Sequence, residues 1–531
     1  MLLRQAHFLG AAMDDTSTGQ RSHTDQLDAR LLRIAGVCVL GSMMSIVDTT
    51  VVTVAQRTFV ATFHTTQAMV AWTMTGYTLA LAAVIPLAGW VADRFGTKRP
   101  FMGSLLAFTF GSLLCAMAPN ITLLVVFRVV QGLGGGMLMP LVLTILTREA
   151  GPRRLGRVLA ILGIPMLLGP VFGPVLGGWL IDSYGWQWIF WINLPIGLIT
   201  LLLAATVFPG DQPTPSESFD VLGMLLLSPG LATFLYGVSV VPARGTVTDR
   251  HVWIPAALGL ALIVGFVLHA SYRAEHPLID LRLFTNRVVA LANSAMFLFA
   301  VSFFGAGLLF PSYFQELLHQ TPLGAGMSMV PRGIGAMVTM PLAGSMMDKR
   351  GPGKILLVGV TLIAAGMGIF AYGVARQAAY LPTLLIGLTI MGLGMGLTMM
   401  PLSAAAVQTL APHHIARGST LVSVNQQVGA SVGTALMSMI LTSQFNRSEN
   451  VAAARKIADL QEDAARRGVP VDPSSIPPQA LNPDFKGNVL HDLSHAYSVV
   501  FAAAVGLVAL TLVPVAFLPK KPAGQMSKSA K

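Results

Sequence analysis

Two ionisable residues stand inside segments that otherwise read as membrane-spanning. Asp48 lies in SIVDTTVVTVA, residues 45–55, and Arg128 begins RVVQGLGGG, residues 128–136. A charged side chain in the hydrocarbon core of a bilayer costs at least ~2.5 kcal/mol, so each should face other helices and seek a partner. At 1.5 Å per residue, Asp48 lies ~25 Å along its segment from Leu31, and Arg128 lies ~12 Å along a segment that enters from the other side. Both depths fall in the outer half of a ~30 Å core and permit contact.

Such a pair could carry a proton. Burial favours the neutral carboxylic acid, whereas a neighbouring cation favours the carboxylate, so Asp48 beside Arg128 would be held between two opposing effects. We hypothesise that a proton from outside neutralises Asp48 and favours one of two states, which are open toward opposite sides of the membrane. Substrate that enters from the cytoplasm or the inner leaflet would then favour release of that proton. The alternative is a permanent ion pair that only orients two helices.

The composition indicates that lipid surrounds most of the chain. Of its 531 residues, 54% are hydrophobic and only 11% are charged, whereas a soluble protein has roughly 25% charged residues. A helix that spans a bilayer needs ~20 mostly apolar residues, and fourteen segments meet this requirement. We expect spans at 31–56, 68–92, 100–118, 121–146, 155–181, 187–208, 221–241, 252–272, 288–314, 324–347, 354–374, 383–408, 417–442 and 496–518.

The distribution of Lys and Arg predicts the orientation of these spans. Short loops with an excess of basic residues stay in the cytoplasm, so the net charge of +11 is first of all evidence about topology. Basic clusters at 94–99, 148–157, 273–287 and 349–354 fall on alternate loops, which places both termini inside. The loop 443–495 is also basic, but long loops cross the membrane largely regardless of charge.

The spans divide the chain into two halves around an inserted pair. The largest extramembrane piece is the outer loop 443–495, where residues 450–468 read as a polar-faced helix that 469–478 breaks. This loop is either a solvated cap or a docking surface for a periplasmic adaptor protein. We expect a cytoplasmic tail at 1–30, an N-terminal six-helix half at 31–208, an inserted helix pair at 221–272, a C-terminal six-helix half at 288–518 and a second cytoplasmic tail at 519–531.

A repeated motif supports the division into halves. The spacing G-x-x-x-D-x-x-G occurs in GWVADRFG and again in GSMMDKRG, each time where an even-numbered span reaches a basic cytoplasmic loop. Internal repeats are typical of secondary transporters, and a charge cluster that breaks and reforms can bias two states. A purely structural loop cap is the alternative. The repeated residues are Gly89, Asp93 and Gly96 in one half, and Gly344, Asp348 and Gly351 in the other.

Polar and aromatic residues of the spans are candidates for a substrate cavity, which should lie between the halves near the midplane. They could equally pack helices together. Arg332 lies near mid-depth without an obvious acidic partner, and it either contacts substrate or bonds to backbone freed by Pro331. The 27 methionines suit varied lipophilic ligands because Met repacks easily. The cavity candidates are Trp72, Tyr77, Gln131, Asn193, Asn293, Tyr313, Gln315, Arg332, Asn425 and Gln426.

Together these motifs resemble the major facilitator superfamily, and within it the fourteen-helix drug:proton antiporters of the EmrB/QacA type. The resemblance covers the chain from about Leu31 to Leu518. GWVADRFGTKR matches the loop motif between helices 2 and 3, RVVQGLGGG the helix 4 motif with its arginine, and VDTTVVTVA the helix 1 motif. WQWIFWINLPIG, residues 186–197, is similar to the helix 6 signature, with Gln187 where arginine is common. Thr97 departs from the loop motif, where a basic residue is frequent.

A further match is to the helix 5 motif that separates exporters from importers in this superfamily. It lies in GPVFGPVLGG, and its residues are Gly169, Pro170, Gly173, Pro174, Gly177 and Gly178. The three prolines of this segment, including Pro165, would bend the helix. The resemblance also implies that the loop motif acts as a conformational switch, with Arg94, Lys98 and Arg99 as its basic residues.

The residues and the resemblance predict an all-α integral membrane protein with the major facilitator fold, fourteen helices in two six-helix halves plus an inserted pair. The predicted function is proton-coupled multidrug efflux of lipophilic, often cationic, compounds by alternating access. The alternative is a dedicated exporter of an endogenous lipid, siderophore or secondary metabolite.

The expected setting is a bacterial plasma or inner membrane, which the chain crosses many times. The sequence has no Walker loop, metal-ligand cluster or nucleophile–base constellation. We therefore expect no enzyme activity, no cofactor beyond the proton gradient and no nucleic-acid partner. The expected partners are a small-molecule substrate, membrane lipids and a periplasmic adaptor.

Overall fold

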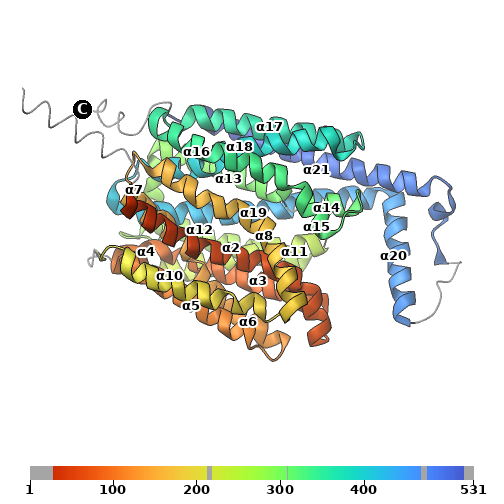
Figure 1. Ribbon diagram of the computed structural model, residues 1–531, viewed down its shortest axis with the longest axis horizontal. Helices are drawn as coiled ribbons and strands as arrows, with labels where there is room; N and C mark the ends of the chain where they lie inside the picture. The colour runs from red at the N-terminus through yellow and green to blue at the C-terminus, as the bar shows by residue number, and fades with distance from the viewer. Residues whose placement is uncertain (1–27, 212–217, 245, 308, 468–474, 520–531) are drawn as a thin grey trace, which may run out of the picture.

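The computed structural model describes residues 28–211, 218–244, 246–307, 309–467 and 475–519. These residues contain helices and no strand, and most helices run along one common direction (Figure 1). The expected cytoplasmic tails at 1–30 and 519–531 lie almost wholly outside the described residues. We call the end of the bundle that carries Asp28, Asp93 and Asp348 the cytoplasmic end, following the orientation that the basic loops predict.

The N-terminal half runs from α2 to α10. Polar caps begin several of its helices: Asp28 accepts a hydrogen bond from the backbone N–H of Leu31 at 2.8 Å, and Asn120 caps α6 in the same way. The bounds are α2 Ala29–Phe63, α3 Gln67–Val84, α4 Leu87–Phe95, α5 Lys98–Ala116, α6 Ile121–Gly135, α7 Leu138–Ala150, α8 Leu155–Tyr184, α9 Trp188–Trp191 and α10 Asn193–Val207.

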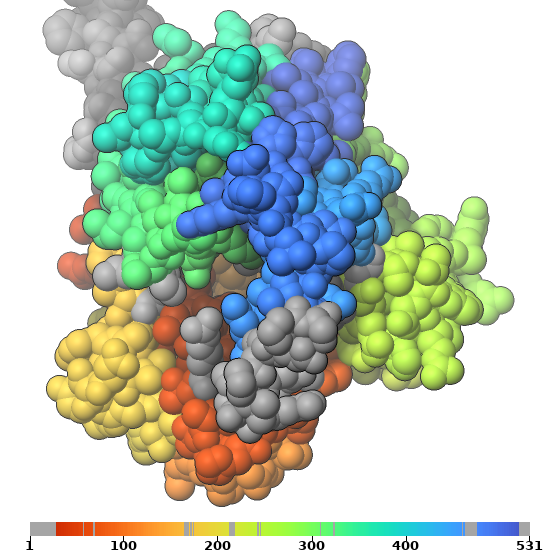
Figure 2. Space-filling view, turned by 90° about the vertical axis from the view of Figure 1, so that its right-hand side faces the viewer, coloured from red at the N-terminus to blue at the C-terminus, as the bar shows by residue number. Residues whose placement is uncertain are grey.

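The inserted pair consists of α11 Val221–Arg244 and α12 Arg250–Tyr272, which pack against each other. Helix α11 also contacts α3 of the N-terminal half and α19 of the C-terminal half. On the α3 side, Trp72 stacks on Tyr236 with ring centroids 5.6 Å apart. Seen from the end opposite the cytoplasmic end, the pair forms a yellow-green lobe at one side of the molecule (Figure 2).

The C-terminal half runs from α13 to α21. Its short turns are η1 Leu281–Thr285, η2 Tyr380–Leu384, η3 Pro412–His414 and η5 Pro478–Leu481. The helices are α13 Arg287–Gly307, α14 Leu309–Glu316, α15 Pro322–Ser328, α16 Val330–Arg350, α17 Pro352–Ala375, α18 Leu385–Val407, α19 Ile415–Arg447, α20 Glu449–Arg467 and α21 Phe485–Ala516.

The helix count agrees with the expected fold class. Among the described residues, eleven helices are long and apolar enough to span a membrane, or twelve if α3 and α4 form one span bent by 51°. The bend falls at Pro86, which has no N–H to continue the helical hydrogen bonds. The two remaining expected spans correspond to α8 and to the pair α15–α16, which pack against each other inside the same bundle.

The outer loop contains the helix that the sequence predicts. Helix α20 crosses the end of the bundle opposite the cytoplasmic end (Figures 1 and 2). Its start is fixed to α21, because Ser448 Oγ and Asn450 Nδ2 donate hydrogen bonds to Asp492 at 2.7 and 3.0 Å. The guanidinium of Arg455 lies 4.5 Å from the ring centre of Phe445 on α19. The sequence places the break at 469–478, and residues 469–474 of it lie outside the described residues.

Candidate functional site

Asp48 and Arg128 form an ion pair inside the N-terminal half. Asp48 comes from α2 and Arg128 from α6, and Arg128 Nη1 lies 2.5 Å from Asp48 Oδ2. Both side chains are completely buried. Removing one partner of such a pair costs about 3–5 kcal/mol, because the other charge is left without compensation. Each charge is therefore stable in this buried position only while the charge of its partner is present.

Further polar groups complete the environment of this pair. Gln131 Nε2 and Asn193 Nδ2 donate hydrogen bonds to Asp48 Oδ1 at 2.9 and 3.0 Å. Arg128 donates to Gln131 Oε1 at 2.7 Å and to the backbone carbonyl of Thr73 at 3.2 Å. Asp48 thus accepts bonds from α6 and α10, so a change in its charge would be felt by three helices at once.

Two features of this cluster bear on what it can do. Arg128 stacks over the ring of Tyr77 at 4.1 Å, and Tyr77 is itself buried with its hydroxyl 3.2 Å from Ser45 Oγ. The second terminal nitrogen of Arg128 has no hydrogen-bond partner in the described part of the chain. A buried donor without an acceptor costs about 1–3 kcal/mol, so this group would gain from a ligand or from water.

The exporter-type motif of α8 packs on the segment of α2 that carries Asp48. A Cβ added at Gly173 would lie 1.9 Å from Thr50 Oγ1, and one added at Gly169 would lie 2.3 Å from Ile46 Cγ2. Gly177 meets Val51 in the same way, at 2.9 Å. Gly178, by contrast, has open space around it. The side chains of Pro165, Pro170 and Pro174 lie outside the described residues.

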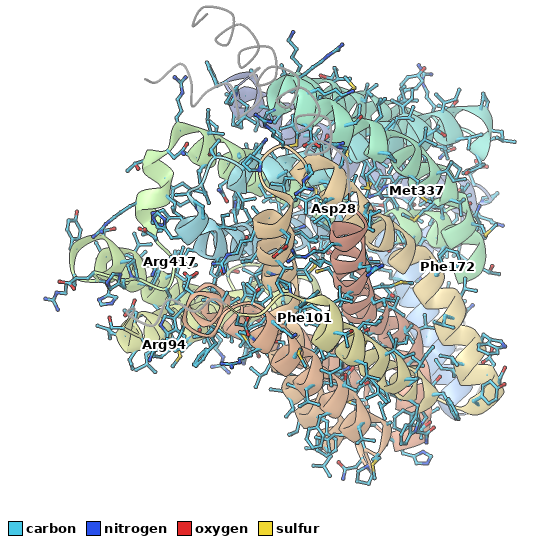
Figure 3. All side chains as sticks on the ribbon, turned by 60° about the vertical axis from the view of Figure 1, so that its left-hand side comes forward. Asp28, Arg94, Phe101, Phe172, Met337 and Arg417 are labelled. Carbon is cyan, nitrogen blue, oxygen red and sulfur yellow. The ribbon has the colours of Figure 1, made fainter. Side chains whose placement is uncertain are left out.

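The two copies of the repeated motif join the halves at the cytoplasmic end. At the end of α16, Asp348 accepts a bond from Arg157 Nε at 2.9 Å and one from the backbone N–H of Gly156 at 3.0 Å, both on α8. At the end of α4, Asp93 lies 2.9 Å from Arg148 Nη2 of α7. Asp93 also lies 3.8 Å from Arg417 Nε of α19, across the boundary between halves. Figure 3 shows Arg417 and Arg94 at this end.

The glycines of the motif occupy equivalent positions in the two halves. Gly89 faces α19, where an added Cβ would lie 3.2 Å from Arg417 Cα, and Gly344 faces Gly156 of α8 at 2.5 Å from its carbonyl oxygen. Gly96 and Gly351 end their helices with φ of 84° and 79°, which favours glycine because other residues are strained there.

The basic residues of the loop motif hold the start of α5. Asp211 accepts hydrogen bonds from the backbone N–H groups of Lys98 and Arg99 at 2.8 and 3.1 Å. The ammonium of Lys98 donates to the carbonyl of Ala205 at 2.6 Å. Arg94 lies in the last turn of α4, where a cation favours the negative end of the helix dipole.

The structure does not gather all the cavity candidates in one place. Tyr77, Gln131 and Asn193 belong to the Asp48 cluster, and Trp72 faces the inserted pair. Asn425 Nδ2 donates to the backbone carbonyl of Asn293 at 2.7 Å and so joins α19 to α13. Gln426 is the next residue of α19. Tyr313 is buried among aromatic rings of the C-terminal half, and Gln315 is exposed.

Arg332 lies in the first turn of α16 and is only 9% exposed. Its guanidinium lies 4.5 Å from the ring centre of Phe303 and 5.2 Å from that of Phe310. Within the described part of the chain it forms no ion pair and no side-chain hydrogen bond. The alternative in which it bonds to backbone freed by Pro331 therefore finds no support in the described geometry.

Comparison with known proteins identifies the family. Residues 38–434 match the model of the Major Facilitator Superfamily. The chain belongs to the major facilitator superfamily. This facilitator is 67% identical to "Multidrug resistance protein B homolog" of Mycobacterium tuberculosis H37Rv, over 95% of this chain and 93% of the relative. It is 26% identical to "Multidrug resistance protein 3" of Bacillus subtilis 168, over 97% of this chain and 100% of that protein.

A solved structure supports the same fold. A double-tryptophan mutant of XylE matches with a TM-score of 0.60 and 14% identity, over 95% of this chain and 100% of that one. At this identity the likeness concerns the fold alone. The facilitator is thus a multi-pass membrane transporter of small molecules and not an enzyme. No group of His, Cys, Asp and Glu residues that could hold a metal ion occurs among its described residues.

Several partners in this facilitator's candidate site were not singled out from the sequence. The sequence places Asn193 only among the cavity candidates, yet it bonds to Asp48 and to Ser112 Oγ at 3.0 Å each. Arg157 and Arg417 counted toward the basic loops and the expected spans, although they meet the acids of the repeated motif. The sequence does contain a signal for these partners, because Arg157 and Arg417 each lie at the start of an expected span, at the cytoplasmic end where the two motif acids also lie.

Proposed function

We propose that this facilitator is a proton-coupled exporter of lipophilic, often cationic, drugs. The observation that carries the proposal is the packing of the α8 glycines against the α2 segment that holds Asp48. Gly169 and Gly173 face Ile46 and Thr50, one turn or less from Asp48 along the helix. A change in the charge of Asp48 that moves α2 would therefore act directly on α8, which also contacts the other half.

The proposed coupling step places the proton on Asp48. Protonation removes the charge that holds Arg128 Nη1 at 2.5 Å and weakens the bonds from Gln131 and Asn193. The freed guanidinium of Arg128 then needs another acceptor, and the cluster rearranges. Release of the proton restores the ion pair. Proton binding and release thus switch the arrangement of three helices.

The proposed conformational switch is the cytoplasmic end. Asp348 with Arg157 and Asp93 with Arg417 bridge the halves there, so we infer that the arrangement corresponds to a state closed toward the cytoplasm. Opening toward the cytoplasm breaks both bridges, which is a two-state element of the kind that alternating access requires. We propose the same domains that the sequence predicts, with two six-helix halves at 31–208 and 288–518 around an inserted helix pair at 221–272.

The proposed drug class follows the named relatives of the chain. The names of the relatives from Mycobacterium tuberculosis and Bacillus subtilis support multidrug resistance as the setting. A dedicated exporter of an endogenous lipid, siderophore or secondary metabolite remains the second candidate, because the same fold serves both. Lipids surround the spans, and α20 at the outer end offers a surface for a periplasmic adaptor.

The test measures ethidium extrusion from vesicles with an imposed pH gradient. We expect the wild type to extrude ethidium only when the gradient is present, and Asp48→Asn to abolish this extrusion. Asp182→Asn is the matched control, because Asp182 is an exposed acid at the far end of α8. Full gradient-driven extrusion by Asp48→Asn would refute the coupling role. No extrusion by the wild type would favour the dedicated exporter.

A further inference from the structure

Arg332 is a deeply placed cation that forms no ion pair with any described residue. It lies ~27 Å from the end of α16 at Arg350, and Asp48 lies ~28 Å from the start of α2 at Ala29, at 1.5 Å per residue. The two residues therefore stand at similar heights in the two halves. Away from the ends of the expected spans, the charged residues of the two halves are Asp48, Arg128 and Arg332. The first two neutralise each other, which leaves one positive charge uncompensated.

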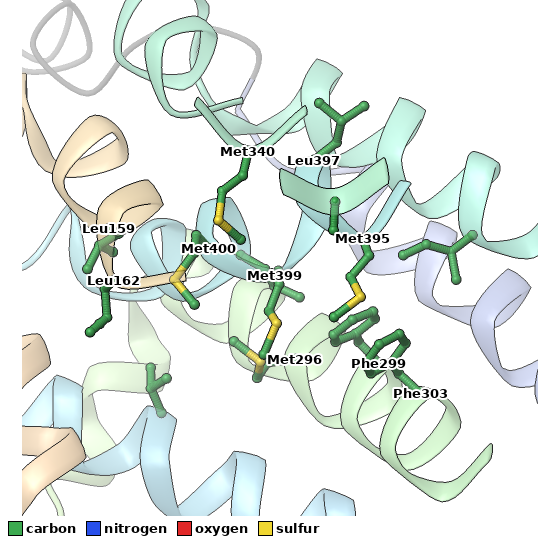
Figure 4. Packing of buried hydrophobic residues seen from close by; sticks show 14 of the residues in the cluster. Leu159, Leu162, Met296, Phe299, Phe303, Met340, Met395, Leu397, Met399 and Met400 are labelled. Atoms are coloured by element: carbon green, nitrogen blue, oxygen red, sulfur yellow. The ribbon is translucent and has the colours of Figure 1, made fainter. Parts of the chain in front are cut away.

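The surroundings of Arg332 are aromatic and apolar. Phe303 and Phe310 lie against the guanidinium, and Phe299 stacks on Phe303 with ring centroids 5.0 Å apart. Beyond these rings, buried methionines of α13, α16 and α18 extend from Phe299 and Phe303 toward Leu159 and Leu162 of α8 (Figure 4). The methionines of this cluster are Met296, Met340, Met395, Met399 and Met400.

The aromatic contacts hold the guanidinium but leave its donors unused. A planar guanidinium has five N–H donors, and rings above or beside it satisfy none of them as a hydrogen-bond acceptor would. The residue as a whole is only 9% exposed, so its donors reach little water and would gain from an acceptor that comes with a ligand. The acceptor that matches this planar fork is a carboxylate, which can bond to it through both oxygens.

We propose that Arg332 binds the carboxylate of a lipophilic organic anion whose apolar body lies against the Phe and Met side chains around it. This inference rests on the proposed export function and names a substrate class for it, because lipophilic cations alone would not use an uncompensated positive charge. The site lies in the C-terminal half, apart from the Asp48 cluster, so proton binding and anion binding involve different residues.

Binding of three pyrene derivatives to the purified full-length protein tests the proposal. Pyrenebutyrate, pyrenebutanol and pyrenebutylamine share one apolar body and differ in charge. We expect the wild type to bind the carboxylate about tenfold or more tightly than the alcohol, since a bidentate charge-assisted pair replaces a neutral contact. Arg332→Gln should remove this preference, and Arg332→Lys should keep part of it. Arg376→Gln is the matched control, because Arg376 is an exposed arginine that also lies over a ring, that of Tyr372.

Two outcomes would overturn the inference. One is a wild type that shows no preference for pyrenebutyrate over pyrenebutanol, and the other is a preference that persists in Arg332→Gln. Because binding is measured without a gradient, the result does not depend on export. Ethidium extrusion by the same variants separates the two ideas: extrusion without carboxylate preference leaves the exporter and removes the anion site. Carboxylate preference without extrusion does the reverse.

Discussion

Gly344 on α16 and Gly156 on α8 approach each other so closely that neither has room for a side chain. A Cβ on Gly344 would lie 2.5 Å from the carbonyl oxygen of Gly156, and a Cβ on Gly156 would lie 2.7 Å from that of Gly344. The contact joins the two halves through backbone atoms, which cannot move aside as a flexible side chain could. This close approach at the cytoplasmic end therefore requires glycine at both positions, because a methyl group on either one would overlap with the backbone of the other.

Gly344→Ala should separate the halves at the cytoplasmic end. Overpacking of a tight contact costs about 1–3 kcal/mol, and this cost disappears once the helices part. Spin labels at Arg153→Cys and Lys349→Cys, both exposed at this end, report the separation by pulsed electron resonance. The native Cys38 and Cys115 are buried and should not compete for label. We expect longer label distances in Gly344→Ala.

The control for this measurement lies on the same helix. An added Cβ at Gly333 meets no atom within 4 Å, so Gly333→Ala changes helix propensity without a clash. Its label distances should equal those of the wild type. Equal distances in Gly344→Ala and Gly333→Ala would show that the contact does not limit closure.

Asp348→Asn should loosen the start of α8. The carboxylate accepts bonds from Arg157 Nε at 2.9 Å and from the backbone N–H of Gly156 at 3.0 Å. Because Arg157 is 28% exposed, we expect a loss of only about 1–2 kcal/mol of closure free energy. Hydrogen exchange of peptides that contain Gly156 should become several-fold faster. Lys349→Gln, at the exposed neighbouring position, should leave this exchange unchanged, and unchanged exchange in Asp348→Asn would contradict the prediction.

The sequence was sufficient for the fold but not for all of the site. Apolar length and the basic loops predicted the helical bundle, because lipid permits few alternatives. The depths of Asp48 and Arg128 permitted contact, and the structure has them in contact. Depth alone could not say how each helix is rotated about its axis. Trp72 therefore faces the inserted pair, whereas Asn193 turns toward Asp48.

Contacts between halves were harder to predict for a related reason. The motif predicted that Asp93 and Asp348 matter together, since they repeat at equal spacing. Arg417, the partner of Asp93, lies 324 residues away from it in sequence. Arg157, the partner of Asp348, lies 191 residues away from it. A single sequence carries no signal for such pairs beyond charge complementarity. Helix breaks within spans were missed as well, because the continuous apolar run at 121–146 hides the break between α6 and α7.

Gly173→Ala should impair export through α2. The added Cβ would overlap with Thr50 Oγ1, at 1.9 Å, and so displace the turn that follows Asp48. We expect several-fold slower gradient-driven ethidium extrusion and about 1–3 kcal/mol lower stability. Adding Thr50→Ala removes the nearest atom but keeps the Cβ of residue 50 at 2.6 Å, so it should restore only part of both. Gly178→Ala, which meets open space, should behave as the wild type. A double variant as impaired as Gly173→Ala would show that the overlap is not the cause.

Asn193→Leu should impair gradient-driven export. Asn193 Nδ2 donates to Asp48 Oδ1 at 3.0 Å, and a leucine of similar size cannot make this bond. A buried acceptor that loses a donor costs about 1–3 kcal/mol. We expect several-fold slower ethidium extrusion, because the Asp48–Arg128 pair loses one of the groups that hold it in place.

A control on the same helix distinguishes this effect from general damage to α10. Thr200→Val removes a buried hydroxyl whose only described bond is to the carbonyl of Ile196 at 2.7 Å. This variant should extrude ethidium at close to the wild-type rate. Equal extrusion by Asn193→Leu and Thr200→Val would show that export does not depend on the bond from Asn193 to Asp48.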